Sequence, residues 1–403
     1  MKKPRRMEGR NEHTTQKCRR ERLSRCSRCK VAYFCDRNCQ VAAWPDHKVE
    51  CTLLKRVFPD VPSTPQRQFA KILIKLKEKD PREITEDVLG QKRSFHDLVS
   101  NMEHVRNDAQ CMGEFKLGLF LVKAFFGAGW SPSEAKGLEI FSKMIVNSYG
   151  IYDEENCIVG KGLYIGPSIF NHSCAPNALF VFDGRKLILR AIQDIACDAL
   201  DDIRVCYIDL LELQKERAAN LQKRFFFNCN CSRCTADKAA EYLTEKSPAL
   251  TAQARVLFDR FNELGTLSQA DIEHFYESAE RFLETHALPE TDIARVKVRR
   301  LAANCAIFCQ KFDAALTHLF AMEDTYRKCY GPFHPEYVLL LSCIARVLHQ
   351  VVRLEESLKY YKQVADVAAV SHGRQHPLSR ETAKCILCCT LEIEATKRAR
   401  RVP

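Results

Sequence analysis

The sequence contains no apolar run of about 18 residues, so none of its segments is long enough to cross a membrane as a helix. Its basic start, Met1 to Arg6, lacks the apolar stretch that a secretory signal peptide requires. The sequence therefore gives no indication of secretion, and we expect its 21 cysteines to lie in a reducing compartment. Clustered thiols in such a compartment favour metal binding over disulfide bonds.

Acidic residues do not balance the basic ones. The chain has 62 Lys and Arg against 51 Asp and Glu, which gives a formal net charge of +11. This excess is consistent with solubility alone or with weak contact to nucleic acid, and the composition does not decide between the two. With 403 residues, 46% of them hydrophobic, we expect a soluble monomer of about two to four domains.

Six of the cysteines fall within one short segment, residues 18–51. The spacing of its main motif is Cys26-x2-Cys29-x5-Cys35-x3-Cys39-x7-His47-x3-Cys51. A Cys-x2-Cys turn lets two thiolates reach one ion, and an x3 spacing places two ligands on one face of a helix. Thiolates and imidazoles are the ligands of tetrahedral zinc. Because so short a segment has no useful core of its own, zinc should supply most of its folding free energy, on the order of 10 kcal/mol per site, and chelation should unfold it first.

The same segment resembles the MYND zinc module, through Cys26-Ser-Arg-Cys29, Tyr33-Phe-Cys35, Cys39-Gln40, Ala43-Trp-Pro-Asp-His47 and Glu50-Cys51. The resemblance implies two zinc ions with interleaved ligands. It assigns one ion to Cys26, Cys29, His47 and Cys51. It assigns the other to Cys35, Cys39 and Cys18, with the fourth ligand left open between His13 and a water because Thr15 replaces the usual cysteine.

Helical spacing extends over residues 52–145, and a strand-like texture follows from 158 to 207. Within it, residues 179–189 predict a β-hairpin with an Asp183-Gly184 turn. The helical pattern returns at 210–228 and again from about 245 to the end.

The last helical region repeats with a period of 42 residues. Gly331-Pro-Phe-His334-Pro335 recurs as Gly373-Arg-Gln-His376-Pro377, and residues 312–316 recur as 354–358. A fixed period in a helical region predicts an array of tetratricopeptide-like hairpins. We interpret the two histidines as turn residues at repeat boundaries rather than as metal ligands.

An ordered set of motifs lies between these regions: Gly162-Leu-Tyr164, Asn171-His-Ser-Cys-Ala-Pro-Asn177, Val205-Cys-Tyr-Ile-Asp209 and Cys229-x-Cys231-x2-Cys234. In this order they resemble the SET methyltransferase domain with its post-SET zinc site. With the MYND module ahead and the helical array behind, the chain resembles the SET-and-MYND (SMYD) protein-lysine methyltransferases.

The resemblance implies an α+β multidomain fold. Its parts are a basic tail (1–17), a MYND module (18–51), a helical connecting region (52–145), an incomplete β-rich SET core (146–209), a post-SET zinc site (210–240) and an all-α tetratricopeptide-like array (241–403). It also implies S-adenosylmethionine as the methyl donor and a lysine of a histone or another protein as the acceptor. A narrow channel would favour the neutral lysine amine that this chemistry needs.

The resemblance assigns roles to single residues. Tyr207 is the catalytic tyrosine that orients the amine. The cofactor-binding residues are Asn171, His172, Phe227, Asn147, Asn101 and Ser168, although Asn147 and Asn101 also suit core or capping roles. A further zinc, the third in all, is held by Cys174, Cys229, Cys231 and Cys234. Cys206 is interpreted as a small core residue.

Several positions depart from the family pattern. The Gly-rich cofactor loop that precedes the MYND module is missing from the seventeen residues ahead of Cys18, and residues 197–202 replace a Gly-Glu-Glu-Leu turn. Phe225, Arg93 and Val99 replace two tyrosines and a glutamate. The sequence therefore predicts a methyltransferase with impaired catalysis or, alternatively, a non-catalytic adaptor that binds proline-containing peptides through MYND and docks proteins on its helices. Basic runs at 2–6 and 397–401 predict a distribution between nucleus and cytoplasm.

Overall fold

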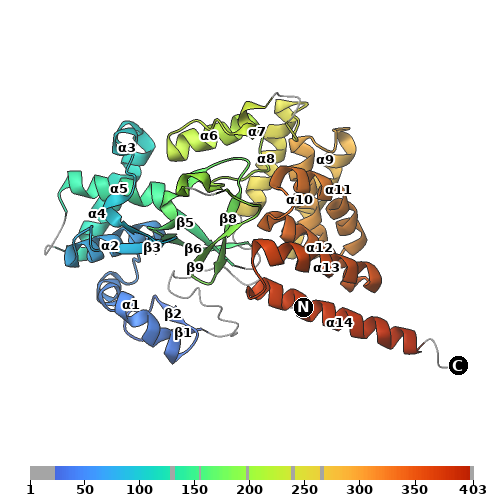
Figure 1. The fold of residues 1–403 in the computed structure, drawn as a ribbon, viewed down its shortest axis with the longest axis horizontal. Coiled ribbons are helices and arrows are strands. Elements are labelled where there is room, and N and C mark those ends of the chain that lie inside the picture. Colours follow the sequence, from blue (N-terminus) through green and yellow to red (C-terminus); the bar gives the residue numbers. More distant parts are fainter. Residues whose placement is uncertain are drawn as a thin grey trace.

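The computed structural model describes residues 23–127, 132–153, 156–196, 199–236, 241–263 and 267–399. Strands occupy the middle of the molecule, between a helical N-terminal part and a helical C-terminal array (Figure 1). Three predicted features lie outside the described residues: Cys18 with its neighbours, Cys197 in the replaced turn, and the two basic runs except for residues 397–399.

The N-terminal zinc module is a two-stranded sheet followed by one long helix. Strands β1 (Ser24–Arg25) and β2 (Tyr33–Phe34) pair antiparallel, and α1 spans Arg37–Val57. The carboxylate of Asp36 caps α1 by accepting a hydrogen bond of 2.8 Å from the backbone N–H of Cys39. The cap fixes the start of the helix that carries Cys39, His47 and Cys51.

The region 52–145 is mainly helical, as the sequence predicts, but it also contains a hairpin. Its helices are α2 (Thr64–Glu78), α3 (Met102–Asn107), α4 (Ala109–Phe126) and α5 (Glu134–Asn147). Strands β3 (Thr85–Val88) and β4 (Gln91–Ser94) pair antiparallel, followed by the short 3-10 helix η1 (Phe95–Asp97). The prediction of a helical connecting region did not include this hairpin, in which Leu89 and Gly90 both adopt positive φ (46° and 81°) and make a tight turn.

The central strands form three separate pairs. The antiparallel pairs are β5 (Ser148–Tyr152) with β6 (Ile158–Leu163) and β8 (Ala178–Asp183) with β9 (Lys186–Ala191). The parallel pair is β7 (Asn171–His172) with β10 (Arg204–Val205), and the 3-10 helices are η3 (Pro167–Ile169) and η4 (Leu200–Asp202). The predicted hairpin is confirmed with a shifted turn. Asp183 pairs with Lys186, so the loop residues are Gly184, with φ of 61°, and Arg185.

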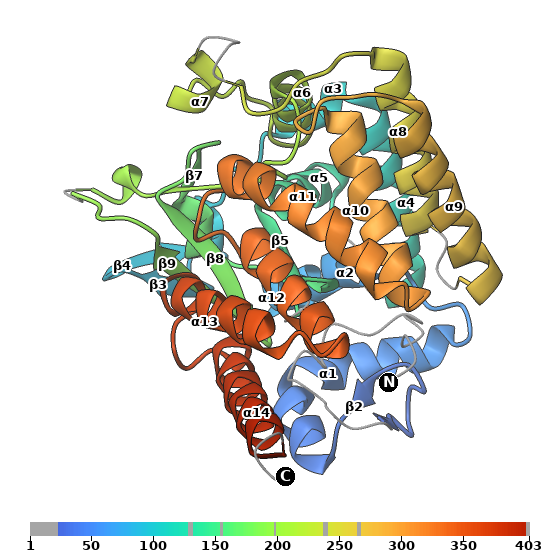
Figure 2. The same cartoon turned by 90° about the vertical axis from the view of Figure 1, so that its right-hand side faces the viewer.

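The C-terminal part is helical, as predicted. After α6 (Gln214–Phe225) and α7 (Ser232–Thr235), the helices are α8 (Pro248–Glu263), α9 (Gln269–Thr285), α10 (Ile293–Phe308), α11 (Phe312–Tyr330), α12 (Pro335–Gln350), α13 (Leu354–Ser371) and α14 (Pro377–Ala399). Successive helices from α9 to α14 pack on one another (Figure 2). None of the helices in the described ranges is long and apolar enough to cross a membrane.

The 42-residue period corresponds to one helical hairpin. Helices α11 and α13 begin at equivalent positions, and so do α12 and α14. His334 caps α12, since its Nδ1 accepts a hydrogen bond of 3.2 Å from the N–H of Glu336. His376 accepts the same bond from Leu378 at 3.2 Å. The turn interpretation of both histidines is therefore confirmed.

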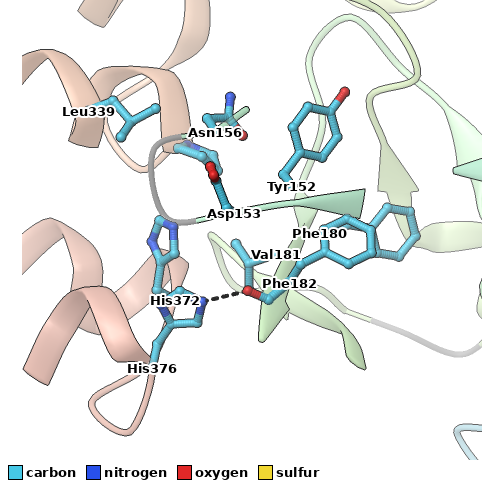
Figure 3. Close-up of a pocket in the computed structure, with 10 residues that line it drawn as sticks. Tyr152, Asp153, Asn156, Phe180, Val181, Phe182, Leu339, His372 and His376 are labelled. Atoms are coloured by element: carbon cyan, nitrogen blue, oxygen red, sulfur yellow. Dashed lines mark hydrogen bonds between the residues drawn. The ribbon is translucent and has the colours of Figure 1, made fainter. Parts of the chain in front are cut away.

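The last repeat holds the β8–β9 hairpin against the array. Arg190 of β9 donates a hydrogen bond of 2.6 Å to the carbonyl of Val370 in α13. His376 bonds the carbonyl oxygen of Phe182 in β8 at 2.9 Å, beside His372 and a cavity of about 40 Å³ (Figure 3). These contacts fix one wall of the larger cavity described next.

Candidate functional site

A cavity of about 590 Å³ lies between the central strands and the α11–α12 turn. This volume is typical of a small-molecule site. Its walls come from β5, β8, the segment after β10, the end of α6 and the start of α12. The lining includes six of the residues predicted for catalysis or cofactor binding: Tyr207, Asn171, Phe227, Asn147, Asn101 and Ser168. The side chain of His172 is not part of it.

Tyr207 stands at the centre of an aromatic group. Its ring centroid is 4.9 Å from that of Phe225 and 6.5 Å from that of Phe227, which lies perpendicular to it. Its hydroxyl donates a hydrogen bond to the carbonyl oxygen of Phe170. Burial raises the pKa of Tyr207 to about 12, so the hydroxyl stays protonated at neutral pH and can only serve as a hydrogen-bonding group, not as a base.

Asn147 and Asn101 combine cavity lining with structural bonds. The amide nitrogen of Asn147 donates to the carbonyls of Val99 (2.8 Å) and Lys143 (2.7 Å). Both amide hydrogens are thereby used, and only the carbonyl oxygen remains to accept a bond from a ligand. Asn101 precedes α3 with a left-handed backbone (φ 46°), and its amide nitrogen donates to the carbonyl of Phe225 at 3.3 Å.

Asn171 and Ser168 come from two adjacent elements, β7 and η3. Asn171 is exposed and donates a hydrogen bond of 3.3 Å to Asp201. Ser168, in η3, donates one of 2.6 Å to the carbonyl of Tyr164. Both line the cavity, so their positions are compatible with cofactor contact.

The MYND cluster, defined as Cys26, Cys29, His47 and Cys51, is completely buried. The Cys26 and Cys51 sulfurs are 3.8 Å apart, and the Cys29 sulfur is 3.7 Å from Nε2 of His47. A tetrahedron around zinc with Zn–S bonds of about 2.3 Å has edges of about 3.8 Å, so this donor set fits a zinc ion.

The four-thiolate cluster, defined as Cys174, Cys229, Cys231 and Cys234, joins the motif after β7 to the segment that contains α7. Its ligand atoms also lie within 4.8 Å of one another, and the sulfurs of Cys174 and Cys234 are 3.5 Å apart. Zinc bound by four thiolates carries a net charge of −2. The nearby Arg217 is fully buried in a two-pronged ion pair with Glu241, and its positive charge acts on Cys174 and Cys234.

The remaining predicted zinc ligands are only partly described. Cys35 and Cys39 flank the start of α1, one helical turn apart, and Cys18 lies outside the described residues. The structure therefore contains two complete Cys/His clusters within the described ranges, and the further site stays a prediction.

Sequence reasoning missed two polar partners. Glu50 is buried behind the MYND cluster, with its carboxylate 3.8 Å from Nδ1 of His47 and 2.7 Å from Arg67 of α2. Its position three residues after His47 on one helix is the only local signal for it. Glu336, at the far end of the cavity, accepts a bond of 2.5 Å from Asn156, and burial raises its pKa. No local pattern connects these two distant segments.

Comparisons with known proteins agree with this architecture. Residues 16–51 match the MYND finger family. The chain is 31% identical over 386 residues to the histone-lysine N-methyltransferase SMYD3 of Homo sapiens, and 30% identical over 392 residues to that of Mus musculus; each match covers 94% of this chain and 87% of the relative. It is 25% identical over 382 residues to the N-lysine methyltransferase SMYD2-A of Danio rerio, covering 91% and 86%.

The fold and the clusters define a multidomain α+β zinc protein with a C-terminal helical array. Identity at this level, over nearly the whole chain, places it more narrowly. The chain belongs to the SET-and-MYND (SMYD) family of protein-lysine methyltransferases.

Proposed function

We propose that the protein is an S-adenosylmethionine-dependent protein-lysine N-methyltransferase, acting on lysines of histones or other proteins. One observation carries the proposal: Tyr207 and five of the six predicted cofactor residues, drawn from five separate stretches of chain, line a single cavity. Core residues or helix caps would have no reason to converge in this way.

The cavity offers suitable groups for the cofactor. The carbonyl oxygen of Asn147 is available to accept a bond from an amino group, and Asn171 presents an exposed amide. Phe227 offers an aromatic face for the adenine ring. When bound, S-adenosylmethionine supplies an electrophilic methyl group on a positively charged sulfur.

The aromatic residues serve the substrate lysine. Tyr207, Phe225 and Phe227 form one aromatic group in the cavity wall, and such apolar surroundings favour a neutral amine over an ammonium ion. The hydroxyl of Tyr207 donates its hydrogen bond to the carbonyl of Phe170, so its oxygen then accepts a hydrogen bond from the amine and orients it. Orientation of this kind can supply up to roughly 7–11 kcal/mol of the barrier reduction.

We also predict that the rate of methyl transfer is lower than in family members that keep the usual residues. Of the substituted positions, Phe225 removes one hydroxyl from the aromatic group around Tyr207. Arg93 donates from Nη2 to the carbonyl of Asp97 at 3.1 Å, and Val99 provides the carbonyl that Asn147 binds. These substitutions leave the cavity open and Tyr207 enclosed, so we expect slow but measurable methyl transfer.

A titration calorimetry measurement of S-adenosylmethionine binding tests the proposal, followed by methyl transfer to histone and peptide-library lysines. Asn171→Ala should weaken cofactor binding about ten-fold through the loss of one hydrogen-bonding group. His349→Ala is the matched control, because His349 is half-buried against Glu392 of α14 and does not line the cavity. Wild-type protein that neither binds the cofactor nor transfers methyl groups would refute the enzyme assignment.

A binding function is the second candidate, because α1 exposes apolar side chains beside the MYND cluster. Val41 is 61% and Trp44 40% exposed. We propose that this face of the module binds proline-containing peptides, with or without catalysis. Trp44→Ala should abolish binding of a fluorescent proline-rich peptide in an anisotropy titration, whereas Lys77→Ala on α2 should not; equal affinity in all three proteins would exclude this face.

We further propose a third zinc, bound by Cys35, Cys39 and Cys18. Metal analysis of the purified full chain should then give about three zinc ions, falling by one in Cys35→Ser. A content of two that Cys35→Ser leaves unchanged would rule out the third site.

A further inference from the structure

His172 is the one predicted cofactor residue whose side chain does not line the cavity. It is buried, and both of its ring nitrogens are engaged elsewhere. The backbone N–H of Tyr207 lies 3.1 Å from Nδ1, and Nε2 lies 3.3 Å from the sulfur of Cys174. The imidazole thus stands between the catalytic tyrosine and a ligand of the four-thiolate cluster.

The two contacts determine the state of the ring. A backbone N–H can only donate, so Nδ1 must be the accepting, unprotonated nitrogen. The ring hydrogen is then on Nε2, which faces the sulfur of Cys174. A zinc-bound thiolate is a good acceptor for such a bond, and ligand partners of this kind stabilise the bound form of the ligand.

Local topology holds the ring in place. His172 pairs with Val205 in the parallel β7–β10 ladder, and the N–H of Ser173 donates to the carbonyl of Val205 at 2.9 Å. Strand β10 leads directly to Tyr207, whose ring centroid is 5.3 Å from that of His172. Since both ring nitrogens already have partners within the protein, the side chain has no polar group with which to bind a cofactor.

We infer that His172 is a positioning residue: its imidazole couples the zinc-bound sulfur of Cys174 to the backbone of Tyr207, so that the four-thiolate cluster fixes the catalytic tyrosine. The inference rests on the proposed methyltransferase function for its catalytic consequence. The hydrogen-bonded link itself does not depend on that function.

Two amide substitutions separate the two halves of the link. The side-chain amide of Asn reaches the place of Nδ1, so His172→Asn keeps an acceptor for Tyr207 and loses the donor to Cys174. The longer Gln reaches the place of Nε2, so His172→Gln keeps the donor and loses the acceptor. His172→Leu loses both, and His349→Gln is the control, because the half-buried His349 of α12 contacts neither the cavity nor either cluster.

Four quantities are measured on the full-length zinc-loaded chain: zinc release to a chelator, the Tyr207 amide resonance in ¹⁵N-tyrosine-labelled protein, kcat, and the dissociation constant of S-adenosylmethionine. The Tyr207 resonance is assigned by its loss in Tyr207→Phe. We expect His172→Asn to release one zinc roughly ten-fold faster. We expect His172→Gln to shift the Tyr207 amide and lower kcat by roughly ten-fold, more than Asn does. Cofactor affinity should change less than three-fold in both.

Variants that bind the cofactor ten-fold or more weakly while zinc release and the Tyr207 amide stay unchanged would overturn the inference, because His172 would then act on the cofactor. Equal effects of Asn and Gln on zinc release and on the amide would overturn it as well. If the wild type shows no methyl transfer, the proposed function fails, and the zinc and amide measurements alone decide whether the link exists.

Discussion

The two Cys/His clusters show two different ways in which a chain builds a metal site. The MYND cluster takes all its ligands from residues 26–51, and two of them, His47 and Cys51, lie on α1. The four-thiolate cluster joins Cys174 to Cys234, 60 positions later, and thereby ties the motif after β7 to the segment behind α6. The first cluster organises its own module, whereas the second closes a long loop around the cavity.

The surroundings of the two clusters differ as well, and those of the MYND cluster contradict one prediction from the sequence. The sequence suggested that the MYND segment has no core apart from its metal. In the structure, Phe34 and Leu54 of the module belong to the same apolar cluster as Phe69 of α2 and Phe115 of α4. The metal is therefore not the only source of folding free energy for the MYND module. The prediction that chelation unfolds this module first assumed that it has no other core, and that assumption is wrong.

Removal of one ligand from each cluster in turn should give the largest difference in cofactor binding and methyl transfer. Cys174→Ser should abolish cofactor binding and methyl transfer, by at least about 100-fold, because it releases the segment that positions Asn171 and Tyr207. Cys26→Ser should lose one zinc but change both quantities by less than about ten-fold, because the MYND cluster does not line the cavity.

Calorimetric cofactor binding, methyl transfer and zinc content check this pair, with Cys388→Ser on the exposed surface of α14 as the control. Equal losses in the two cluster variants would mean that the MYND module also supports the cavity.

Tyr207→Phe should abolish most methyl transfer without changing zinc binding at either cluster. The hydroxyl orients the amine, so its loss should lower methyl transfer by about 100-fold or more. The ring and its packing remain, and the lost bond to Phe170 should change the free energy of unfolding by only ~1 kcal/mol. Methyl-transfer rates, urea unfolding and zinc content separate the two effects. Wild-type activity in this variant would refute the catalytic role of Tyr207.

The same contrast explains what could be predicted from the sequence. The grouping of the MYND ligands came from the resemblance to that module. Local spacing was enough for the β8–β9 hairpin and the helix starts of the 42-residue repeat, because each depends on neighbours within one turn or one helix. The β3–β4 hairpin was missed because its turn uses Leu89, a residue that rarely adopts positive φ. The role of His172 could not be predicted, since a motif gives a residue's position but not the direction of its side chain.

Zinc release should show a moderate difference between the clusters. All four MYND ligands are buried, whereas Cys229, Cys231 and Cys234 are only half-buried. A chelator should therefore remove zinc from the four-thiolate cluster first, by roughly ten-fold in rate, since access limits exchange. Single-cluster variants Cys26→Ser and Cys174→Ser assign each kinetic phase in a zinc-indicator assay. The opposite order would mean that local unfolding of the MYND module, and not exposure of its ligands, controls release.

Glu50→Gln should produce the most local effect, confined to the MYND cluster. Glu50 is 1% exposed and lies between His47 and the cations of α2, with Arg67 at 2.7 Å and Lys71 at 3.4 Å. A carboxylate beside a ligating histidine orients the ring and raises its basicity, so the neutral amide should weaken zinc binding at this cluster by about 10- to 100-fold. The amide also removes the carboxylate that pairs with Arg67, itself 3% exposed, which should lower the melting temperature of the module. The double variant Glu50→Gln/Arg67→Met removes the buried charges on both sides and serves as the control: stability should recover, but zinc affinity should not.

Competition with a chelator of known affinity in a Cys174→Ser background isolates the MYND ion. If the double variant regains full zinc affinity, Glu50 acts by balancing Arg67 and not by orienting His47, and the two clusters would then differ only in how the chain assembles them.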